Sequence, residues 1–334
     1  LMQLLRKLLF PISLIYALVI FVRNLLYDIG VFNSKSFSVK TICIGNLSVG
    51  GTGKTPMTEL LLRSLSPRYK IAVLSRGYRR KSSGYILATE TTKVADIGDE
   101  PFQLFSKFPE ITVAVDADRK NGIKQLQNEI KPNLILLDDA FQHRKVNPDY
   151  SILLTTYDEL YIDDWYLPTG NLRDVKYVAE RADCIVVTKC PESLGKDEQE
   201  AVKTKIDPKE HQTILFAYLS YGNKVIGIKS SLSLSDFVDK EVSLVTGIAN
   251  PKPLVSYLKT KGISFEHLAY KDHHFFSKSE LEILKCKKCI LTTEKDYVRL
   301  KDDLDNLFYL PVAHSFLGDG KTTLEQELEA LMNR

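Results

Sequence analysis

The stretch of sequence that decides the fold is Ser48-Val49-Gly50-Gly51-Thr52-Gly53-Lys54-Thr55. A run rich in β-branched residues at 38–44 precedes it and predicts a strand, and apolar residues at helical spacing over 54–65 follow it. Glycines between a strand and a helix let backbone N–H groups converge on an anion, which the start of a helix also attracts. Ser48 stands where the strict pattern has glycine. The setting still predicts a phosphate-binding loop, in which Lys54 reaches the phosphates of a nucleoside triphosphate and Thr55 holds Mg²⁺.

Further apolar runs alternate with helical patterns along the chain around this loop. The strand-like runs cover residues 70–74, 111–115, 133–137, 150–154 and 184–188, and a helical pattern covers residues 117–130. The run LILL at 134–137 is apolar at every position, as expected for a strand buried on both faces of a parallel sheet. The alternation predicts a P-loop NTPase-like, doubly wound α/β domain over residues 31–212.

A second domain is expected beyond residue 212. Two strand-like runs, TILFAYL at 213–219 and KVIGI at 224–228, flank the turn-forming residues SYGN. This arrangement predicts a β-hairpin over residues 213–229 that links the two domains. After it the strand–helix alternation resumes, which predicts a second, smaller α/β domain over residues 230–334.

The amino-terminal end carries an uncharged run at 8–22 (LLFPISLIYALVIFV), with Arg6, Lys7 and Arg23 beside it. A helix of that length spans about 22 Å, which is shorter than the roughly 30 Å hydrocarbon core of a bilayer. No small-residue cleavage site follows the run, which argues against a signal peptide. A buried core helix remains an alternative. We favour a membrane-interface helix within residues 1–30, with the basic side chains at the lipid headgroups.

Composition limits the classes of partner and the compartment. The net charge is +3 in 334 residues, and 44% of the residues are hydrophobic. A nucleic-acid-binding domain is usually strongly basic, so we expect no nucleic-acid partner. The five cysteines are odd in number and scattered, which fits a reducing compartment rather than a disulfide framework. We also expect the chain to be a monomer.

Two acidic residues, Asp138 and Asp139, directly follow the apolar run at 134–137. The carboxyl ends of parallel strands face the ligand crevice, so these acids are expected beside the phosphates. Asp138 is a candidate ligand of Mg²⁺ together with Thr55, although the residues alone do not divide metal binding between Asp138 and Asp139. Residues 140–144 (AFQHR) bring an imidazole and a guanidinium to the same place.

The nucleotide base is indicated by a motif that the chain lacks. Guanine recognition in this class of loop usually needs an Asn-Lys-x-Asp stretch after a late strand. The corresponding residues 188–191 read TKCP and contain no aspartate to bind the guanine amino group. The sequence therefore favours ATP over GTP.

Three other stretches are rich in ionisable residues, namely 98–101 (GDEP), 167–174 (LPTGNLRD) and 271–274 (KDHH). A kinase needs a base or orienting group for the attacking hydroxyl and cations for the charge that moves. Each stretch taken alone is more typical of a turn.

Taken together, the motifs resemble one known family. They are GGTGKTP (50–56), SRGY (75–78), GDEP (98–101), DDAFQHR (138–144), LPTGNLRD (167–174), VTGIANP (245–251), DHH (272–274) and TTEKD (292–296). In this order they resemble tetraacyldisaccharide 4′-kinase, the lipid A pathway kinase of Gram-negative bacteria. The resemblance implies transfer of the γ-phosphoryl group of ATP, with Mg²⁺, to the 4′-hydroxyl of a tetraacylated glucosamine disaccharide 1-phosphate. It also implies a location at the cytoplasmic face of the bacterial inner membrane, with the membrane surface and this lipid as partners.

The resemblance implies roles for particular residues. In the family an aspartate of the GDEP-like motif and a histidine of the DH motif are thought to act together on the hydroxyl, and they correspond to Asp99 and His273. Asp99 would accept the hydroxyl proton, with His273 assisting it. Lys54 would hold the phosphates, and Asp139 would act beside Asp138 at the metal and the catalytic centre.

Three arginines, Arg76, Arg144 and Arg173, are candidates to bind the γ-phosphate or the 1-phosphate of the substrate, because guanidinium groups match phosphate geometry. Asp174 stands where the family usually has glutamate, which puts a metal or phosphate role for it in doubt. Because His273 belongs to the second predicted domain and the phosphate loop to the first, we expect the cleft between the domains to close on ATP.

Two other functions share part of this pattern. A membrane-attached P-loop ATPase that drives a partner would need the loop and the acids at 138–139, but not His273. A soluble small-molecule kinase would keep its activity without residues 1–27.

Overall fold

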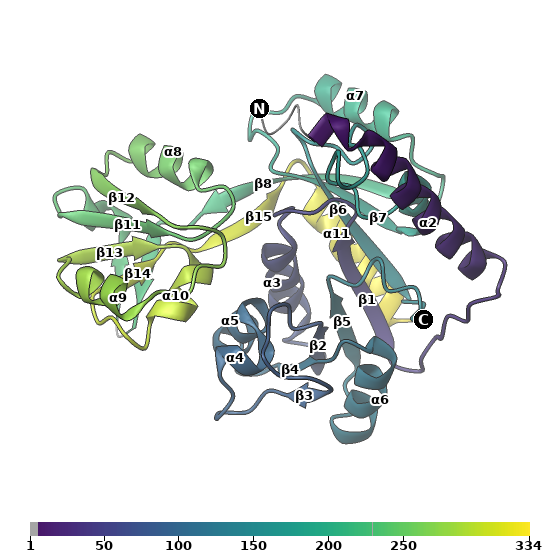
Figure 1. Cartoon of the computed structure of the whole chain (residues 1–334), viewed down its shortest axis with the longest axis horizontal. Coiled ribbons are helices and arrows are strands. Elements are labelled where there is room, and N and C mark those ends of the chain that lie inside the picture. The colour runs from purple at the N-terminus through teal and green to yellow at the C-terminus, as the bar shows by residue number, and fades with distance from the viewer. Residues whose placement is uncertain (1–5, 229) are drawn as a thin grey trace.

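The computed structural model describes residues 6–228 and 230–334. Residues 1–5 of the expected amino-terminal segment and Lys229 of the expected linker lie outside the described part. The chain forms two lobes of unequal size (Figure 1), each built around its own sheet.

The large lobe is built on a nine-stranded sheet with the order β15-β8-β7-β6-β1-β5-β2-β4-β3. Its strands are β1 (Lys40–Asn46), β2 (Ile71–Ser75), β3 (Ile86–Leu87), β4 (Thr112–Val115), β5 (Leu134–Asp138), β6 (Tyr150–Thr156), β7 (Cys184–Thr188), β8 (Thr213–Tyr221) and β15 (Val312–Phe316). All neighbours pair in parallel except the edge strands β3 and β15, which are antiparallel to their neighbours. The doubly wound α/β prediction is therefore confirmed.

Helices cover both faces of this sheet, because its central strands are apolar on both sides. They are α3 (Lys54–Leu65), α4 (Val94–Ile97), α5 (Asp99–Lys107), α6 (Arg119–Glu129), α7 (Lys196–Ile206) and α11 (Gly320–Met332), with a 3₁₀ turn at Lys176–Arg181. Along β1, Ile42 and Ile44 pack into one core with Met57 and Leu61 of α3, whereas Cys43 packs into the core on the opposite face. This alternation follows from the two-residue period of a strand.

The small lobe contains a six-stranded sheet with the order β10-β9-β14-β13-β11-β12. Its strands are β9 (Lys224–Gly227), β10 (Ser231–Ser233), β11 (Val242–Thr246), β12 (Phe265–Ala269), β13 (Cys289–Thr292) and β14 (Leu307–Tyr309). Its helices are α8 (Lys252–Thr260), α9 (Lys278–Lys285) and α10 (Glu294–Leu300), with a 3₁₀ turn at Leu234–Phe237. The predicted second α/β domain is present, with a parallel centre of β14, β13, β11 and β12.

The connection between the lobes differs from the predicted hairpin over residues 213–229. Strand β8 pairs with β7 and β15 in the large sheet, whereas β9 pairs with β10 and β14 in the small one. The chain then returns through β15 to α11, whose Leu324, Leu328 and Leu331 are buried in the core of the large lobe. Residues 312–334 therefore do not belong to the small lobe, and the antiparallel strands β8 and β15 join the two lobes (Figure 1).

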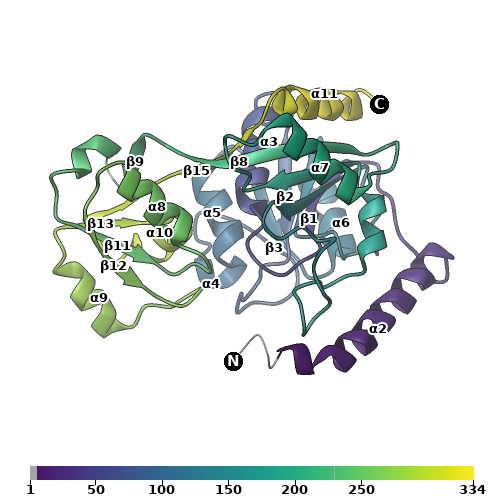
Figure 2. The ribbon, with the colours of Figure 1, turned by 90° about the horizontal axis from the view of Figure 1, so that it is seen from above.

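Helix α2 (Phe10–Asp28) lies along the outside of the large lobe, on the side opposite α11 (Figure 2). It is 19 residues long and extends beyond the predicted apolar run to Asp28. Its length and composition would allow it to cross a membrane, yet only 11% of its most apolar 18-residue stretch is buried. Its buried residues are the polar Ser13 and Asn24. The alternative of a buried core helix is therefore wrong.

Candidate active site

The phosphate loop, residues 48–55, connects β1 to α3 as the sequence predicted. Gly50 and Gly53 have φ angles of +119° and +90°, a region of backbone conformation that favours glycine. The Lys54 ammonium lies 3.3 Å from Asn46 Oδ1 and 3.7 Å from Asp139 Oδ1. Lys54 therefore lies between the end of β1 and the acidic end of β5.

Asp138 is the last residue of β5, the strand next to β1. It is buried, with 3% of its surface exposed. The Ser75 hydroxyl donates to its carboxylate at 3.1 Å, and Arg119 donates to its backbone carbonyl at 3.1 Å. Burial raises the pKa of Asp138 to about 7, and the nearby negative charges of Glu100 and Asp139 add to this effect. Glu100 and Ser75 lie in the GDEP and SRGY motifs, but nothing in the sequence alone marks them as neighbours of Asp138.

The donor set fits a magnesium ion shared with phosphates. No group of three His, Cys, Asp or Glu side chains that could hold a metal lies within residues 6–228 and 230–334. Mg²⁺ commonly binds through one or two carboxylates together with substrate phosphates and water, so such a group is not required. Burial is the main cause of the raised pKa of Asp138, and a divalent cation would offset both this burial and the added negative charges of Glu100 and Asp139.

Arg173 connects this acidic end to the phosphate loop. Its guanidinium donates to both carboxylate oxygens of Asp139, at 3.2 Å for Oδ2, and also to Asn46. Burial opposes ionisation of Asp139, but the charges of Lys54 and Arg173 outweigh it and lower the pKa of this carboxyl. Two cations, Lys54 and Arg173, are thus held beside the loop where a phosphate would lie.

The other two predicted phosphate-binding arginines are placed differently. Arg76 is exposed just beyond β2. Arg144 is buried beneath α2, where it donates to the Asn24 carbonyl at 3.1 Å and pairs with Asp28 at 2.6 Å. The expected substrate role of Arg144 is therefore not supported, because its guanidinium is used to hold α2 on the large lobe.

Asp99 and His273 meet across the two lobes. His273 Nδ1 lies 2.9 Å from Asp99 Oδ2, although the two residues are 174 positions apart. Asp99 begins α5 of the large lobe, and His273, with a φ of +58°, lies on the small lobe in the loop after β12. The backbone N–H of His273 donates to the Gly247 carbonyl at 3.0 Å, which fixes this loop. The expected pairing of these two residues is present in the structure.

Two cations of α10 surround this pair. Arg299 donates to Asp99 Oδ2 and lies 3.2 Å from His273 Nδ1, and Lys295 lies 2.9 Å from His273 Nε2. Burial opposes ionisation of Asp99, but the bonds from His273 and Arg299 lower the pKa of Asp99 well below its usual range. Sequence reasoning missed both cations, although Lys295 belongs to the quoted TTEKD motif.

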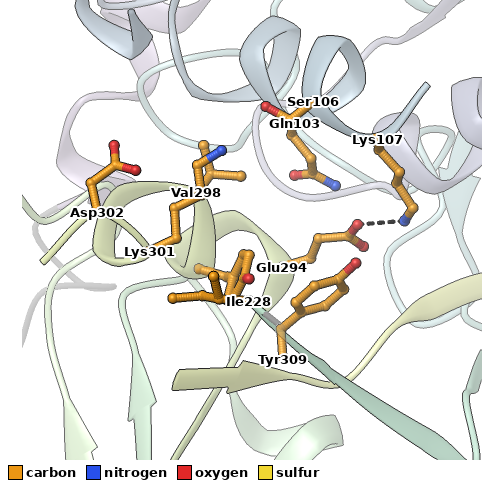
Figure 3. Close-up of a pocket in the computed structure, with 10 residues that line it drawn as sticks. Gln103, Ser106, Lys107, Ile228, Glu294, Val298, Lys301, Asp302 and Tyr309 are labelled. Atoms are coloured by element: carbon orange, nitrogen blue, oxygen red, sulfur yellow. Dashed lines mark ion pairs between the residues drawn. The ribbon is translucent and has the colours of Figure 1, made fainter. Parts of the chain in front are cut away.

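A second contact between the lobes lies at the end of α5 and the start of α10. Lys107 of α5 pairs with Glu294 at 2.5 Å and with Glu59 of α3 at 2.6 Å. A cavity of about 390 Å³ borders this cluster, and Gln103 and Tyr309 are among the residues that line it (Figure 3). Lys107, which is partly buried, therefore connects α3, α5 and α10, the helices that carry Lys54, Asp99 and Arg299.

The polar side of α2, together with Arg6 before this helix, contacts the loop at 167–174. Asn24 donates to Asp174 at 2.7 Å, Tyr16 donates to the Arg173 carbonyl at 3.0 Å, and Arg6 donates to the Gly170 carbonyl at 2.6 Å. Asp174, whose metal or phosphate role was in doubt, is fully buried in this contact. The segment that carries Arg173 is thus fastened directly to the apolar helix.

Comparison with known proteins gives a consistent result. The family model of tetraacyldisaccharide-1-P 4′-kinase matches residues 5–333. Proteins named tetraacyldisaccharide 4′-kinase from Flavobacterium johnsoniae and Bacteroides thetaiotaomicron are 48% and 42% identical to this chain. The matches cover 95% and 98% of this chain, and 94% and 90% of those proteins. A crystal structure described as the "apo" form of LpxK from Aquifex aeolicus in complex with ATP superposes with a TM-score of 0.80 at 28% identity, over 98% of this chain and 99% of that one. The chain therefore belongs to the tetraacyldisaccharide-1-phosphate 4′-kinase family.

Proposed function

We propose that this chain transfers the γ-phosphoryl group of ATP to the 4′-hydroxyl of a tetraacyldisaccharide 1-phosphate. The observation that carries this proposal is the contact of Asp99 with His273 across the lobes, in a chain that also has a phosphate loop. An ATPase that only drives a partner has no need of a carboxylate–imidazole pair built from two lobes. The ATP complex of the LpxK from Aquifex aeolicus supports ATP as the phosphoryl donor.

Phosphoryl transfer is mostly a matter of positioning and charge stabilisation. Backbone N–H groups of residues 48–55 would hold the phosphates, and Lys54 and Arg173 would stabilise the negative charge that shifts during transfer. Asp139 contacts both cations, Lys54 through Oδ1 and Arg173 through both oxygens. Mg²⁺, held by Thr55 and Asp138 together with the phosphates, would neutralise their charge and fix their geometry.

Asp99 is suited to orient the acceptor hydroxyl and to receive its proton late in the reaction. In the described part of the chain, His273 and Arg299 both bond to Asp99 Oδ2, which leaves Oδ1 for the hydroxyl. The lowered pKa of Asp99 keeps it ionised and makes it a weak base. A weak base is sufficient because the transition state is loose and the hydroxyl proton need not leave before the phosphorus–oxygen bond breaks.

The exposed face of α2 supports a place at the membrane surface. Leu14, Ile15, Leu18 and Val19 are each more than half exposed. Phe10 of the same helix packs edge-to-face on the exposed Trp165 at 5.2 Å, and aromatic residues of this kind favour membrane–water interfaces. We therefore propose that α2 and Trp165 lie on the cytoplasmic face of the bacterial inner membrane, and that the protein works there as a monomer.

The deciding experiment follows the labelled γ-phosphate of ATP with the acceptor in mixed micelles. We expect the label on the extracted lipid, and Asp99→Asn should lower kcat by roughly 100-fold or more with unchanged binding of an ATP analogue. Asp303→Asn, at an exposed position, is the matched control. Label found only as free phosphate would favour the partner-driving ATPase, and a full rate for Asp99→Asn would show that the base is elsewhere.

The membrane placement has its own test. The double variant Ile15→Glu/Leu18→Glu puts charge on the exposed face of α2 without touching its polar side. We expect it to lose activity on acceptor in bilayers while keeping its activity on a short-chain acceptor in detergent. Equal activity on both acceptors would support the soluble-kinase alternative.

A further inference from the structure

One buried histidine touches the phosphate loop and has no part in the chemistry described above. His314 lies in β15, is 5% exposed, and its Nε2 is 2.9 Å from the Gly53 carbonyl oxygen. Burial lowers the pKa of His314 to about 4, so the ring is neutral near pH 7. A neutral ring next to a carbonyl oxygen must carry its proton on Nε2, and it donates to Gly53.

The ring packs directly on the glycine that precedes Lys54. A Cβ added to Gly53 would come within 2.6 Å of His314 Nε2. The φ of +90° at Gly53 also lies in a region that favours glycine. The Gly53 oxygen also accepts the Met57 N–H at 3.1 Å, in the first turn of α3. A carbonyl oxygen has two lone pairs, so it accepts both donors. His314 therefore holds the peptide that sets the direction of Lys54 and Thr55.

A second buried side chain holds the neighbouring carbonyl. The hydroxyl oxygen of Thr188, at the end of β7, lies 2.8 Å from the Thr52 carbonyl oxygen, its shorter contact, and 3.1 Å from that of Thr155. Thr188 is fully buried. Two consecutive carbonyl oxygens of the loop thus have partners on two strands of the large sheet, β7 and β15. Each oxygen shares a planar peptide unit with the N–H of the next residue, so holding the two oxygens also fixes the N–H groups of Gly53 and Lys54, which can then face an anion.

The position of His314 along the chain connects this contact with the small lobe. The last strand of that lobe, β14, ends at Tyr309, and β15 begins at Val312. His314 pairs in register with Leu219 of β8, the other strand that joins the lobes. His314 is therefore where the connection between the lobes meets the phosphate loop.

We propose that His314 is a positioning residue for phosphoryl transfer, which holds the Gly53 peptide in its phosphate-binding conformation and ties it to the strand that enters from the small lobe. This inference rests on the proposed kinase function for its kinetic consequences, but its consequence for nucleotide binding is independent of the acceptor. Loss of the hydrogen bond from His314 should weaken the binding of ATP more than the binding of the lipid acceptor.

The test compares His314→Leu, which removes the donor, with His314→Gln, whose amide reaches the position of Nε2. In the full chain, we expect the leucine variant to bind a non-hydrolysable ATP analogue roughly tenfold more weakly. Its KM for ATP should rise by a similar factor while its KM for the acceptor stays unchanged. The glutamine variant should stay within about threefold of the wild type. His267→Leu is the matched control, because His267 also makes one side-chain bond from a strand, at 2.8 Å to Thr246, but lies in the small lobe.

Two results would overturn the inference: a folded leucine variant that binds the analogue as tightly as the wild type, or equal losses for leucine and glutamine. Should His314→Leu fail to fold, His314→Asn replaces it, because its shorter amide reaches the position of Nδ1 and leaves Gly53 without a donor. A wild-type protein that binds the analogue but does not phosphorylate lipid contradicts the proposed function, while the binding comparison still decides the role of His314.

Discussion

The buried cluster between the lobes leads to a stability prediction whose sign depends on pH. Lys107 carries one positive charge between two carboxylates, those of Glu59 and Glu294. Burial raises the pKa of Glu294 from its ordinary 4.5 to about 7, and the charge of Glu59 adds to this effect, although Lys107 opposes it. Glu294→Gln keeps the shape of the side chain and removes the charge, so it imitates the protonated acid.

The sign and size follow from proton linkage. Between pH 4.5 and about 7 the folded protein keeps a proton on Glu294 that the unfolded chain has released, so stability falls as the pH rises through this window. The shift corresponds to about 3 kcal/mol at pH 8 and to less than about 1 kcal/mol at pH 5. We therefore expect Glu294→Gln to raise the free energy of unfolding at pH 8 by up to about 3 kcal/mol, with little change at pH 5.

Urea unfolding, followed by tryptophan fluorescence and circular dichroism at both pH values, measures this difference. Glu282→Gln is the matched control, because Glu282 is 71% exposed and pairs with Lys285 on the surface, where ion pairs contribute little. A Glu294→Gln variant that is destabilised at pH 8 would refute the reasoning. It would mean that the attraction to Lys107 outweighs the cost of burying the charge.

Three further predictions concern the catalytic pair, the phosphate loop and α2. Arg299→Met removes one donor to Asp99 and should lower kcat roughly tenfold with little change in KM for ATP, and an equal rise in KM would contradict this assignment. Burial lowers the pKa of His314 to about 4. Below about pH 6.5 this histidine is therefore protonated in the unfolded chain but neutral in the folded protein, so the free energy of unfolding falls as the pH drops towards 4. His314→Gln lacks this loss and should shift the acid-unfolding midpoint, followed by circular dichroism, to lower pH. Asn24→Ala removes the side-chain donor of the buried Asp174 and leaves it the Val175 N–H, which should cost about 1–3 kcal/mol. An unchanged melting temperature would show that the contact with Asn24 contributes nothing.

The phosphate loop and its acids could be predicted from the sequence because their signals are local. A β-branched strand, a glycine turn and a helix start follow one another within 38–65, and Asp138 directly follows an apolar strand. The apolar face of α2 could also be predicted, since hydrophobicity and length are properties of one segment. The resemblance to the family predicted that Asp99 and His273 act together. Composition and spacing alone did not distinguish either residue from an ordinary polar residue in a turn.

The pairing of distant segments was decided only by the tertiary structure. The turn at 220–223 indicated a hairpin, but β8 and β9 pair with other strands in two different sheets. Strand pairing depends on where the apolar face of each strand becomes covered, which the turn residues do not determine. Arg144 was expected at the phosphates, yet Asn24 and Asp28 of α2 hold its guanidinium.

The bond between His314 and Gly53 spans 261 positions of the chain. No local pattern marks such a contact, because a buried histidine has the same sequence signal whether it faces a core or a carbonyl oxygen. The sequence by itself predicted where a phosphate would bind, and it determined which segment is apolar enough for a membrane. The return of the chain through β15 decided how the phosphate loop is held, because strand pairing and burial depend on segments that meet only after the chain has folded.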